Sequence, residues 1–367
     1  MENQSKKILI LYAATNSVGH KSIAENIGFY LKQAGFEVEL FDVQKIQSGL
    51  LVNWGAKLYN FLVGQFPFVW SWLYNTQWFI SSTLRFRIKV AAKNHRETLK
   101  YINQIKPDAV ISTHTTASGI VAYLKQQNLY GGKFGIAFSD FHLHRYWLYE
   151  QADFYLANIE EQKQEMVGLG ISPDKIFVCG IILQPKPEVK IIDIKSKLGI
   201  SPADKVILLA SGSQGTGIDE NLISEFLNKP NVKVIVVCGK NKKLFEALGG
   251  KFAQSNIIIL SYYSPMEQLY AIANVFITKP GGLSVAEALR WQLPILISHM
   301  LPGQEELNYA YLAEKNLIMP EPVNIASEAL EELSGAGFKN IIANNPALAV
   351  LLHGQTAPAE VIKSTLA

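Results

Sequence analysis

The sequence predicts an α/β protein with two doubly wound domains, each built around a parallel β-sheet. Three observations lead to this prediction: the length of the chain, its apolar runs and the segments between them. With 367 residues the chain is longer than a typical single domain. The apolar runs are short, continuous and rich in β-branched residues, and helical segments separate them. Runs of this kind are typical of parallel strands that helices cover on both faces.

The predicted strands fall into two groups, separated by a stretch of mixed charge with three prolines, residues 183–204. The first group is 8–14, 37–43, 109–114, 134–140, 154–158 and 176–181, and the second is 206–211, 233–239, 257–260, 275–278 and 294–298. We therefore expect a domain at 1–183, a linker and a second domain at 184–335. A helical tail, 336–367, is expected to pack back on the first domain. In doubly wound folds ligands bind outside the carboxyl ends of the strands, which predicts a site in the interdomain cleft.

Composition excludes several classes of protein. The chain is 49% hydrophobic and 18% charged, which is typical of a globular protein. A net charge of +3 is too small to indicate a nucleic-acid partner. The two cysteines, Cys179 and Cys238, lie far apart in apolar runs and are predicted to be core residues in a reducing compartment. The apolar run near the N-terminus is too short for a signal peptide, so we expect a cytoplasmic protein.

An aromatic, uncharged segment precedes a basic one. Residues 58–84 form 27 positions without a charge, and four of the six tryptophans lie at 54–78. The run is long enough to span a bilayer, but it contains a proline, a glycine and several amides, and tryptophan prefers the headgroup level. Residues 85–106 then carry seven Lys or Arg and one Glu. We predict that 54–106 docks on anionic lipid without crossing the membrane. The expected contacts are Trp70, Trp72, Trp78, Arg85 and Arg87.

The loop "VFITKPGGLSVAEALRW", residues 275–291, predicts an anion site made of backbone. A strand is expected to end at Thr278, and a helix to begin near Ser284 with Glu287 in its first turn. The two glycines between them allow close approach, while the helix offers unpaired N–H groups and the positive end of its dipole. A diphosphate fits there without a metal. The alternative is an ordinary strand–helix turn with a serine N-cap.

Three further loops follow predicted strands. They are "SGSQGTG" at 211–217, "SYYSPMEQLY" at 261–270 and "PGQEELNYAYL" at 302–312. The first repeats the pattern of small residues before a helix, and the second offers backbone groups to a base. The third supplies Gln304, Glu305 and Asn308, whose side chains suit the hydroxyls of a sugar. Together the four loops predict a nucleotide-sugar site.

Several motifs carry a family resemblance. "TKPGGLSVAEAL" followed by "LPILISHMLPGQEELN" resembles the donor-binding region of the monogalactosyldiacylglycerol synthase and processive diacylglycerol glucosyltransferase family. That family is related to the transferase that adds N-acetylglucosamine to the peptidoglycan lipid precursor. "TNSVGHKSIAENIGFYLKQAGFEVELFDV" resembles its Gly-His loop, and "FSDFHLHRYWLYEQADFYLANIEEQKQEMVGLGI" its acceptor-domain signature. The resemblance covers roughly residues 6–335.

The resemblance implies a GT-B fold and inverting transfer of a hexose from a UDP-sugar to diacylglycerol, with no metal or other cofactor. The implied partners are UDP-glucose or UDP-galactose, diacylglycerol and anionic phospholipids, at the cytoplasmic face of the membrane. Carried over residue by residue, the resemblance places Gly281, Gly282, Leu283 and Ser284 at the diphosphate, Glu287 at the ribose, and Gln304 and Glu305 at the hexose. It places Ser213 and Gln214 near the phosphates, and Tyr262 and Tyr263 near the uracil.

The base that accepts the proton of the acceptor hydroxyl has two candidates. His20 follows the first strand at the start of a helix, whose N-terminus disfavours the imidazolium and keeps the ring able to accept a proton. Asp140 is the rival, as the base itself or as the group that orients His20. His142 and His144 suggest a metal beside Asp140, but a phosphate site made of backbone argues against one. His142 is expected on the acceptor side, and His114 is a further candidate.

The sequence is also compatible with other functions. The same fold and donor would serve a UDP-N-acetylglucosamine-dependent transferase acting on a polyprenyl-linked acceptor. A non-catalytic UDP-sugar-binding membrane protein would be expected to lack an intact site, and a soluble epimerase would have no use for residues 58–106. The sequence does not decide between glucose and galactose. It also leaves open whether a second sugar is added and whether the protein dimerises.

Overall fold

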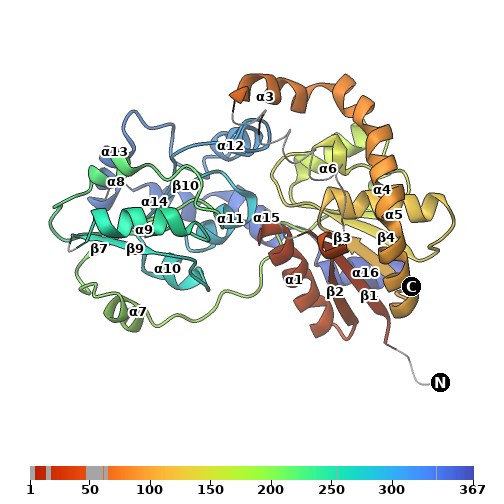
Figure 1. The fold of residues 1–367 in the computed structure, drawn as a ribbon. Helices are drawn as coiled ribbons and strands as arrows, with labels where there is room; N and C mark the ends of the chain where they lie inside the picture. The colour runs from red at the N-terminus through yellow and green to blue at the C-terminus, as the bar shows by residue number, and fades with distance from the viewer. Residues whose placement is uncertain (1–4, 14–17, 47–60, 62–64, 254, 336) are drawn as a thin grey trace. The chain divides into compact units, whose positions relative to one another are not determined.

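The computed structural model describes residues 5–13, 18–46, 61, 65–253, 255–335 and 337–367 (Figure 1). The chain forms two compact units. Unit 1 consists of residues 1–184, 301–307 and 350–367, and unit 2 of residues 185–300 and 308–349. Each unit therefore contains segments that are distant in the sequence.

Unit 1 contains a parallel six-stranded sheet in the order β2-β1-β3-β4-β5-β6. Its strands are β1 (Lys7–Tyr12), β2 (Glu37–Asp42), β3 (Ala109–Ser112), β4 (Lys133–Ala137), β5 (Phe154–Ala157) and β6 (Ile176–Val178). Because β2 lies on one side of β1 and β3 on the other, the direction of winding reverses between β1 and β3. The loops that follow these two strands therefore flank the switch point of the sheet.

Helices cover both faces of this sheet (Figure 1). The helices of unit 1 are α1 (Val18–Gln33), α3 (Pro67–Asn75), α4 (Gln77–Ile105), α5 (Thr115–Gln126), α6 (Glu160–Gly168) and α16 (Pro358–Leu366), with single 3₁₀ turns η1 (Val43–Ile46), η2 (Arg145–Trp147) and η3 (Pro173–Lys175). Side chains alternate along β1: Leu9 belongs to the core beneath α4 and α5, whereas Ile10 lies near Gly28 of α1. This alternation places an apolar core on each side of the sheet.

The C-terminal segment completes unit 1. The Ile181 N–H donates to the Leu351 carbonyl at 2.7 Å, and the Gln355 N–H donates to the Val178 carbonyl at 2.7 Å. Helix α16 then packs against α1, with Ile362 fully buried. Of the tail predicted at 336–367, the part from 350 onward belongs to unit 1 and the part before it to unit 2.

Unit 2 contains a parallel five-stranded sheet in the order β11-β10-β7-β8-β9. Its strands are β7 (Lys205–Ala210), β8 (Val232–Val237), β9 (Ile257–Leu260), β10 (Val275–Thr278) and β11 (Ile295–Ile297). Its helices are α7 (Ile191–Lys197), α8 (Glu220–Ser224), α9 (Lys242–Lys251), α10 (Glu267–Ile272), α11 (Gly282–Arg290), α13 (Ile325–Leu333) and α14 (Phe338–Ala343), while α12 (Gln304–Glu314) and α15 (Pro346–His353) are shared with unit 1. The switch point of this sheet lies between β7 and β10.

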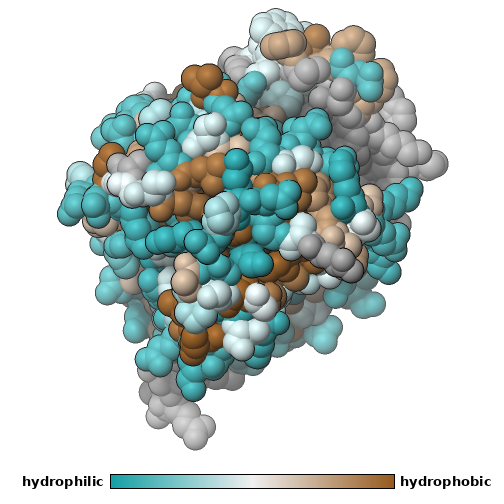
Figure 2. All heavy atoms as spheres, turned by 90° about the vertical axis from the view of Figure 1, so that its left-hand side faces the viewer, coloured by the Kyte–Doolittle hydropathy of each residue, from teal (hydrophilic) through white to brown (hydrophobic). Residues whose placement is uncertain are grey.

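The predicted linker at 183–204 contains a helix of unit 2. Helix α7 packs against α10, and the Lys195 ammonium donates to the carbonyls of Pro202 at 3.1 Å and Asp204 at 2.9 Å. Each of the eleven predicted strands is present in the described residues, and both sheets are parallel. The predicted fold class, two doubly wound α/β units, is therefore confirmed, whereas the predicted cleft stays a prediction. The face of unit 2 seen in Figure 2 is mostly hydrophilic, with apolar residues between the polar ones.

Candidate functional site

Two histidines meet at the switch point of unit 1. His20 is the third residue of α1, which follows β1, and His114 is the N-cap of α5, which follows β3. Their ring centroids are 4.7 Å apart with the ring planes at 89°. The Thr113 hydroxyl donates to the His20 carbonyl at 2.9 Å and so links the two loops. The topology of the sheet thus brings together two imidazoles that are 94 residues apart in the sequence.

Both imidazoles are held neutral. His114 Nδ1 accepts the Thr116 N–H at 3.1 Å, and burial together with the neighbouring His20 lowers the pKa of His114 to about 3. Burial also lowers the pKa of His20, against the opposing effect of the Asp140 charge and of the hydrogen bond with Thr113. The predicted neutral state of His20 agrees with this direction, but its main cause is burial and not the helix N-terminus. Among the described residues, the buried His20 Nδ1 has no hydrogen-bond partner.

Asp140 is buried and its carboxylate is held in place. It lies three residues after β4, in a loop rather than at the strand end. Asp140 Oδ2 accepts from the Ser139 hydroxyl at 2.9 Å and from Gln304 Nε2 at 2.8 Å. The Asp140 carbonyl accepts from Asn158 Nδ2 and Gln162 Nε2, both at 2.9 Å. A carboxylate fixed in this way favours an imidazolium on His20 when that ring takes up a proton.

Two further histidines of unit 1, His142 and His144, contact α3. His144 is buried; its Nε2 donates to the Tyr74 carbonyl at 2.9 Å, and its Nδ1 accepts the Tyr146 N–H at 3.2 Å. His142 Nε2 lies 3.3 Å from the Tyr74 hydroxyl. Both nitrogens of His144 are therefore engaged within the protein. No group of three or more His, Cys, Asp or Glu side chains suited to a metal ion occurs in the described part of the chain. That the reaction needs no metal or cofactor stays a prediction.

Helix α3 exposes one apolar face. Phe68 is 89% exposed and Trp72 is 63% exposed, and Val69 lies on the same face. Trp78, at the start of α4, is 70% exposed. Trp70 is half-buried, with its ring 6.2 Å from that of Tyr74, and its contact with the membrane stays a prediction. Exposed aromatic rings therefore occur both on α3 and in the first turn of α4.

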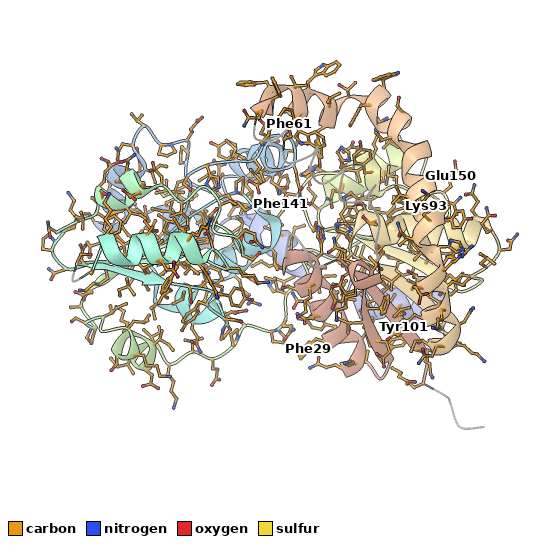
Figure 3. The ribbon with its side chains drawn as sticks, viewed as in Figure 1. Phe29, Phe61, Lys93, Tyr101, Phe141 and Glu150 are labelled. Atoms are coloured by element: carbon orange, nitrogen blue, oxygen red, sulfur yellow. The ribbon has the colours of Figure 1, made fainter. Side chains whose placement is uncertain are left out.

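Basic side chains follow on α4. Lys93, Arg96 and Lys100 are exposed, and Figure 3 shows Lys93 on α4 and Phe61 near α3. The side chains of Arg85 and Arg87, like residues 54–60 and 62–64, lie outside the described part of the structure. Among the described helices, none combines the length and the apolar character that a membrane span requires.

The turn before α12 belongs to unit 1. Gly303 has φ +86° and precedes Gln304, the first residue of the helix. Glu306 Oε2 accepts the Gly303 N–H at 2.7 Å, as in one half of a capping box, and the buried Glu305 carboxylate accepts the Leu301 N–H at 2.8 Å. Gln304, one of the two predicted hexose contacts, therefore points to Asp140, while Glu305, the other, stabilises the turn.

The switch point of unit 2 is formed largely by backbone. Gly281 is the N-cap of α11, which begins at Gly282 and so starts before the predicted Ser284. Glu287 is consequently in the second turn of the helix, and not in the first as predicted. The N–H groups of the first turn have no partner within the helix and carry the positive end of its dipole. This N-terminus, which includes Leu283, has the character of an anion site.

The loop after β7 packs beside this N-terminus and contains a histidine contact that the sequence analysis missed. A Cβ on Gly212 would lie 3.2 Å from Lys279 Cε, next to the turn before α11. His299 follows β11; its Nε2 lies 3.2 Å from the Ser211 hydroxyl, and its Nδ1 lies 3.1 Å from the Ser298 hydroxyl. Gly217 has φ +73° and lies directly against the His299 ring. The only sequence signal for His299 is its position between a strand and the "PGQEELN" loop.

The remaining predicted donor residues also lie at strand ends of unit 2. Ser213 is half-buried and Gln214 is exposed in the loop after β7. Tyr262, which is partly exposed, and Tyr263 follow β9, and the Tyr263 hydroxyl donates to Gln268 Oε1 at 2.7 Å. Asn308 is buried and its Nδ2 donates to the Pro280 carbonyl at 3.0 Å, so it supports the turn before α11.

Glu287 is the most perturbed carboxyl group of unit 2. Burial, followed by the charge of Glu267, raises the pKa of Glu287 from 4.5 to about 7, against the smaller effects of Tyr270 and Arg290. The Tyr270 hydroxyl donates to Glu287 Oε2 at 3.3 Å. Arg290 lies 3.6 Å from the Glu267 carboxylate, so the guanidinium interacts with Glu267 as well as with Glu287. A half-buried carboxylate with one donor is suited to accept hydrogen bonds from ligand hydroxyls.

Comparisons with known proteins agree with this arrangement. Residues 20–183 match the model of monogalactosyldiacylglycerol synthase, and residues 206–318 match the C-terminal domain of glycosyltransferase family 28. A processive diacylglycerol beta-glucosyltransferase of Bacillus cereus strain G9842 is 30% identical over 226 residues. That alignment covers 60% of this chain, and the chain spans 58% of the length of that relative.

Solved structures support the fold. S. aureus MnaA in complex with UDP has a TM-score of 0.62 at 14% identity, covering 98% of this chain and 95% of that one. Medicago truncatula UGT71G1 in complex with UDP-glucose has a TM-score of 0.58 at 13% identity, covering 99% and 98%. The predicted GT-B class is therefore confirmed, and so is the family resemblance. Residues 20–183 are thus similar to the monogalactosyldiacylglycerol synthase family, and residues 206–318 to the C-terminal domain of glycosyltransferase family 28.

Proposed function

We propose that the protein transfers a hexose from UDP-glucose or UDP-galactose to the hydroxyl of diacylglycerol, with inversion, giving a β-glycosyldiacylglycerol. The observation that carries this proposal is the neutral, half-buried His20 in contact with His114 and subject to the charge of Asp140, within the stretch that matches monogalactosyldiacylglycerol synthase. Such an imidazole can accept a proton at neutral pH. The names of the matched relatives, which act on diacylglycerol, support the acceptor.

His20 acts as the base in this proposal. It takes the proton of the acceptor hydroxyl while that oxygen forms a bond to C1 of the hexose, and the bond from C1 to the diphosphate breaks. The Asp140 carboxylate, whose charge favours the protonated form of His20, stabilises the imidazolium that results. His114 stays neutral throughout, because the pKa of about 3 keeps its ring unprotonated.

The donor binds to the strand ends of unit 2. The N-terminus of α11, preceded by Gly281, receives the diphosphate, and its N–H groups stabilise the charge that develops on the departing UDP. The loop at 211–217, with Ser213, contacts the same phosphates. Glu287 accepts the ribose hydroxyls, and Tyr262 and Tyr263 flank the uracil.

The protein binds to the cytoplasmic face of the membrane without spanning it. Diacylglycerol stays in the bilayer, so the acceptor unit must reach the lipid surface. Phe68, Trp72 and Trp78 present exposed rings, and Lys93 and Lys100 add exposed positive charge on the following helix. Aromatic rings at headgroup depth together with basic side chains fit a bilayer that contains anionic phospholipid.

The test is product formation by the purified protein with radiolabelled UDP-glucose or UDP-galactose. Liposomes carry diacylglycerol, with or without anionic phospholipid, and the lipid extract is analysed for labelled product. We expect a labelled glycolipid with one of the two donors, and higher turnover on anionic liposomes. UDP-N-acetylglucosamine with a polyprenyl-linked acceptor is tested in parallel; product there and none with diacylglycerol would overturn the proposed acceptor.

A matched variant tests the docking surface. Trp72→Ala removes an exposed ring, and we expect about tenfold weaker liposome sedimentation. Val323→Ala, at an exposed apolar position of unit 2, is the control and should bind liposomes like the wild type. Equal binding by Trp72→Ala and the wild type would show that α3 does not dock on lipid.

A further inference from the structure

The inner face of α3 contacts the turn that positions Gln304. Ser71 and Tyr74 are three residues apart and lie on one face of the helix, whereas Phe68 and Trp72 are four residues apart and lie on the exposed face. Both faces are largely apolar in sequence, so hydropathy alone does not separate them. The contacts of the folded chain do.

Ser71 bonds directly to the turn. The Ser71 hydroxyl donates to Glu306 Oε2 at 2.6 Å, and the same oxygen accepts the Gly303 N–H at 2.7 Å. The Glu306 carboxylate thus ties α3 to the residue before Gln304. A hydrogen bond to a charged acceptor is stronger than one between neutral groups. The bond from Ser71 to Glu306 therefore holds α3 and the turn together more strongly than a neutral bond would.

Tyr74 contacts the same turn from the next position on that face. A Cβ on Gly303 would lie 2.9 Å from Tyr74 Cγ, so the ring packs directly on the glycine backbone. The Tyr74 carbonyl accepts from His144 Nε2 at 2.9 Å, with the two ring centroids 4.0 Å apart. Two observations favour glycine at position 303. Its φ of +86° is unfavourable for other residues, and a side chain there would collide with the Tyr74 ring.

This series of contacts, from α3 through Gly303 and Gln304, ends at the Asp140 carboxylate. Gln304 follows Gly303 directly and its Nε2 donates to Asp140 Oδ2 at 2.8 Å. A shift of the turn would therefore move Gln304 relative to Asp140. Loss of a positioning contact of this kind changes a reaction rate although the residue touches no substrate.

We propose that Ser71 and Tyr74 are positioning residues for Gln304, so that α3 both docks on lipid and orders the hexose-binding turn. This inference rests on the proposed function. It assigns separate roles to the two faces of one helix: Trp72 serves the membrane, and Ser71 serves the turn. The two roles are separable because a short-chain diacylglycerol dissolved below its micelle concentration needs no membrane.

The experiment compares variants on dissolved dioctanoylglycerol and on long-chain diacylglycerol in anionic liposomes. For Ser71→Ala we expect kcat/KM for the UDP-sugar to fall about tenfold with both acceptors, while liposome sedimentation is unchanged. Ser71→Thr keeps the hydroxyl and should restore most of the activity. Trp72→Ala should show the opposite pattern, with activity lost on liposomes and retained on the dissolved acceptor.

A matched serine controls for the loss of a helical hydroxyl. The exposed Ser82 on α4 donates to the Trp78 carbonyl of its own helix, so Ser82→Ala should leave both activities unchanged. Wild-type kcat/KM in Ser71→Ala would overturn the positioning role and leave the proposed function intact. A wild-type protein inactive with both sugars and both acceptors would instead overturn the proposed function itself.

Discussion

The switch points of the two units have the same topology and different chemistry. In unit 1, ionisable side chains gather there: His20 and His114 in contact, with Asp140 acting on His20. In unit 2, glycines and a helix N-terminus take that place, and His299 bonds to serines beside them. Proton transfer needs a side chain with a tuned pKa, whereas binding a diphosphate needs only fixed N–H groups. The comparison therefore supports the proposal that proton transfer belongs to unit 1 and binding of the UDP part of the donor to unit 2.

The largest expected effect tests the chemical half of this comparison. If His20 is the base, His20→Ala lowers kcat by about 10²–10⁴, because a positioned base contributes that much to proton transfer. The KM for the UDP-sugar should stay within about twofold, since the proposed contacts to the diphosphate, ribose and uracil are in unit 2. Steady-state kinetics with varied donor measure both. His353→Ala, at an exposed histidine, is the control. An unchanged kcat with a raised KM would make His20 a donor-binding residue.

A substitution of Glu287 tests whether this residue of unit 2 lowers the stability of the folded protein while it serves donor binding. Its carboxyl group stays protonated up to about pH 7 in the folded protein, compared with 4.5 for an ordinary glutamate. Because the folded-state pKa is raised, deprotonation between these values opposes folding, and stability is lost as the pH rises. Glu287→Gln should remove this loss and be more stable than the wild type at pH 8, by up to about 3 kcal/mol.

Thermal unfolding at pH 5 and pH 8 measures the effect. The advantage of Glu287→Gln should be small at pH 5 and large at pH 8, and an equal advantage at both would contradict the raised pKa. The same variant should bind the UDP-sugar less tightly, because an amide oxygen accepts hydrogen bonds more weakly than a carboxylate. Unchanged affinity would remove Glu287 from the donor site.

A substitution of His299 tests the proposed role of the loop at 211–217 in donor binding. In His299→Ala the loop at 211–217 loses its contact through Ser211, so the KM for the UDP-sugar should rise about tenfold while kcat changes little. Isothermal titration with UDP alone isolates the effect from chemistry. A fall in kcat at constant KM would show that the residue serves the reaction and not the loop.

The smallest effect concerns the charge on α4. Lys100→Gln should weaken binding to anionic liposomes about fivefold at low salt, since one basic residue near such a surface contributes about 1 kcal/mol. The difference should vanish in concentrated salt. Lys205→Gln, an exposed lysine of unit 2, provides the matched charge change and should bind normally. Equal weakening by both variants would indicate a general charge effect.

The sequence located the strand ends well because their signals are local. Each apolar run and the glycines, serines or histidine after it lie within a few residues, so the loops at His20 and Gly281 were found without tertiary information. The strand order then brings such loops together, as it does for His20 and His114. The family motifs supplied roles for individual residues, which the spacing alone did not.

What the sequence missed depends on contacts between distant segments. Trp70 and Trp72 are the same residue type and only two positions apart. Trp70 is nevertheless half-buried, with its ring beside that of Tyr74, whereas Trp72 is exposed. His299 acquires its partners from the loop after β7, which lies 88 residues earlier. The start of α11 was placed too late because Gly281, which has no side chain to cap the helix, precedes it.

The return of residues 350–367 to unit 1 has a consequence for biosynthesis. A ribosome releases β1 to β6 first, but the hydrogen bonds from Ile181 and Gln355 and the buried Ile362 all require residues of this C-terminal segment. Unit 2 has all of its own strands and helices up to residue 349 before that point. Since domains fold as their residues emerge, the unit encoded second completes its fold first, and the nascent unit 1 waits with the α16-binding surface of α1 uncovered.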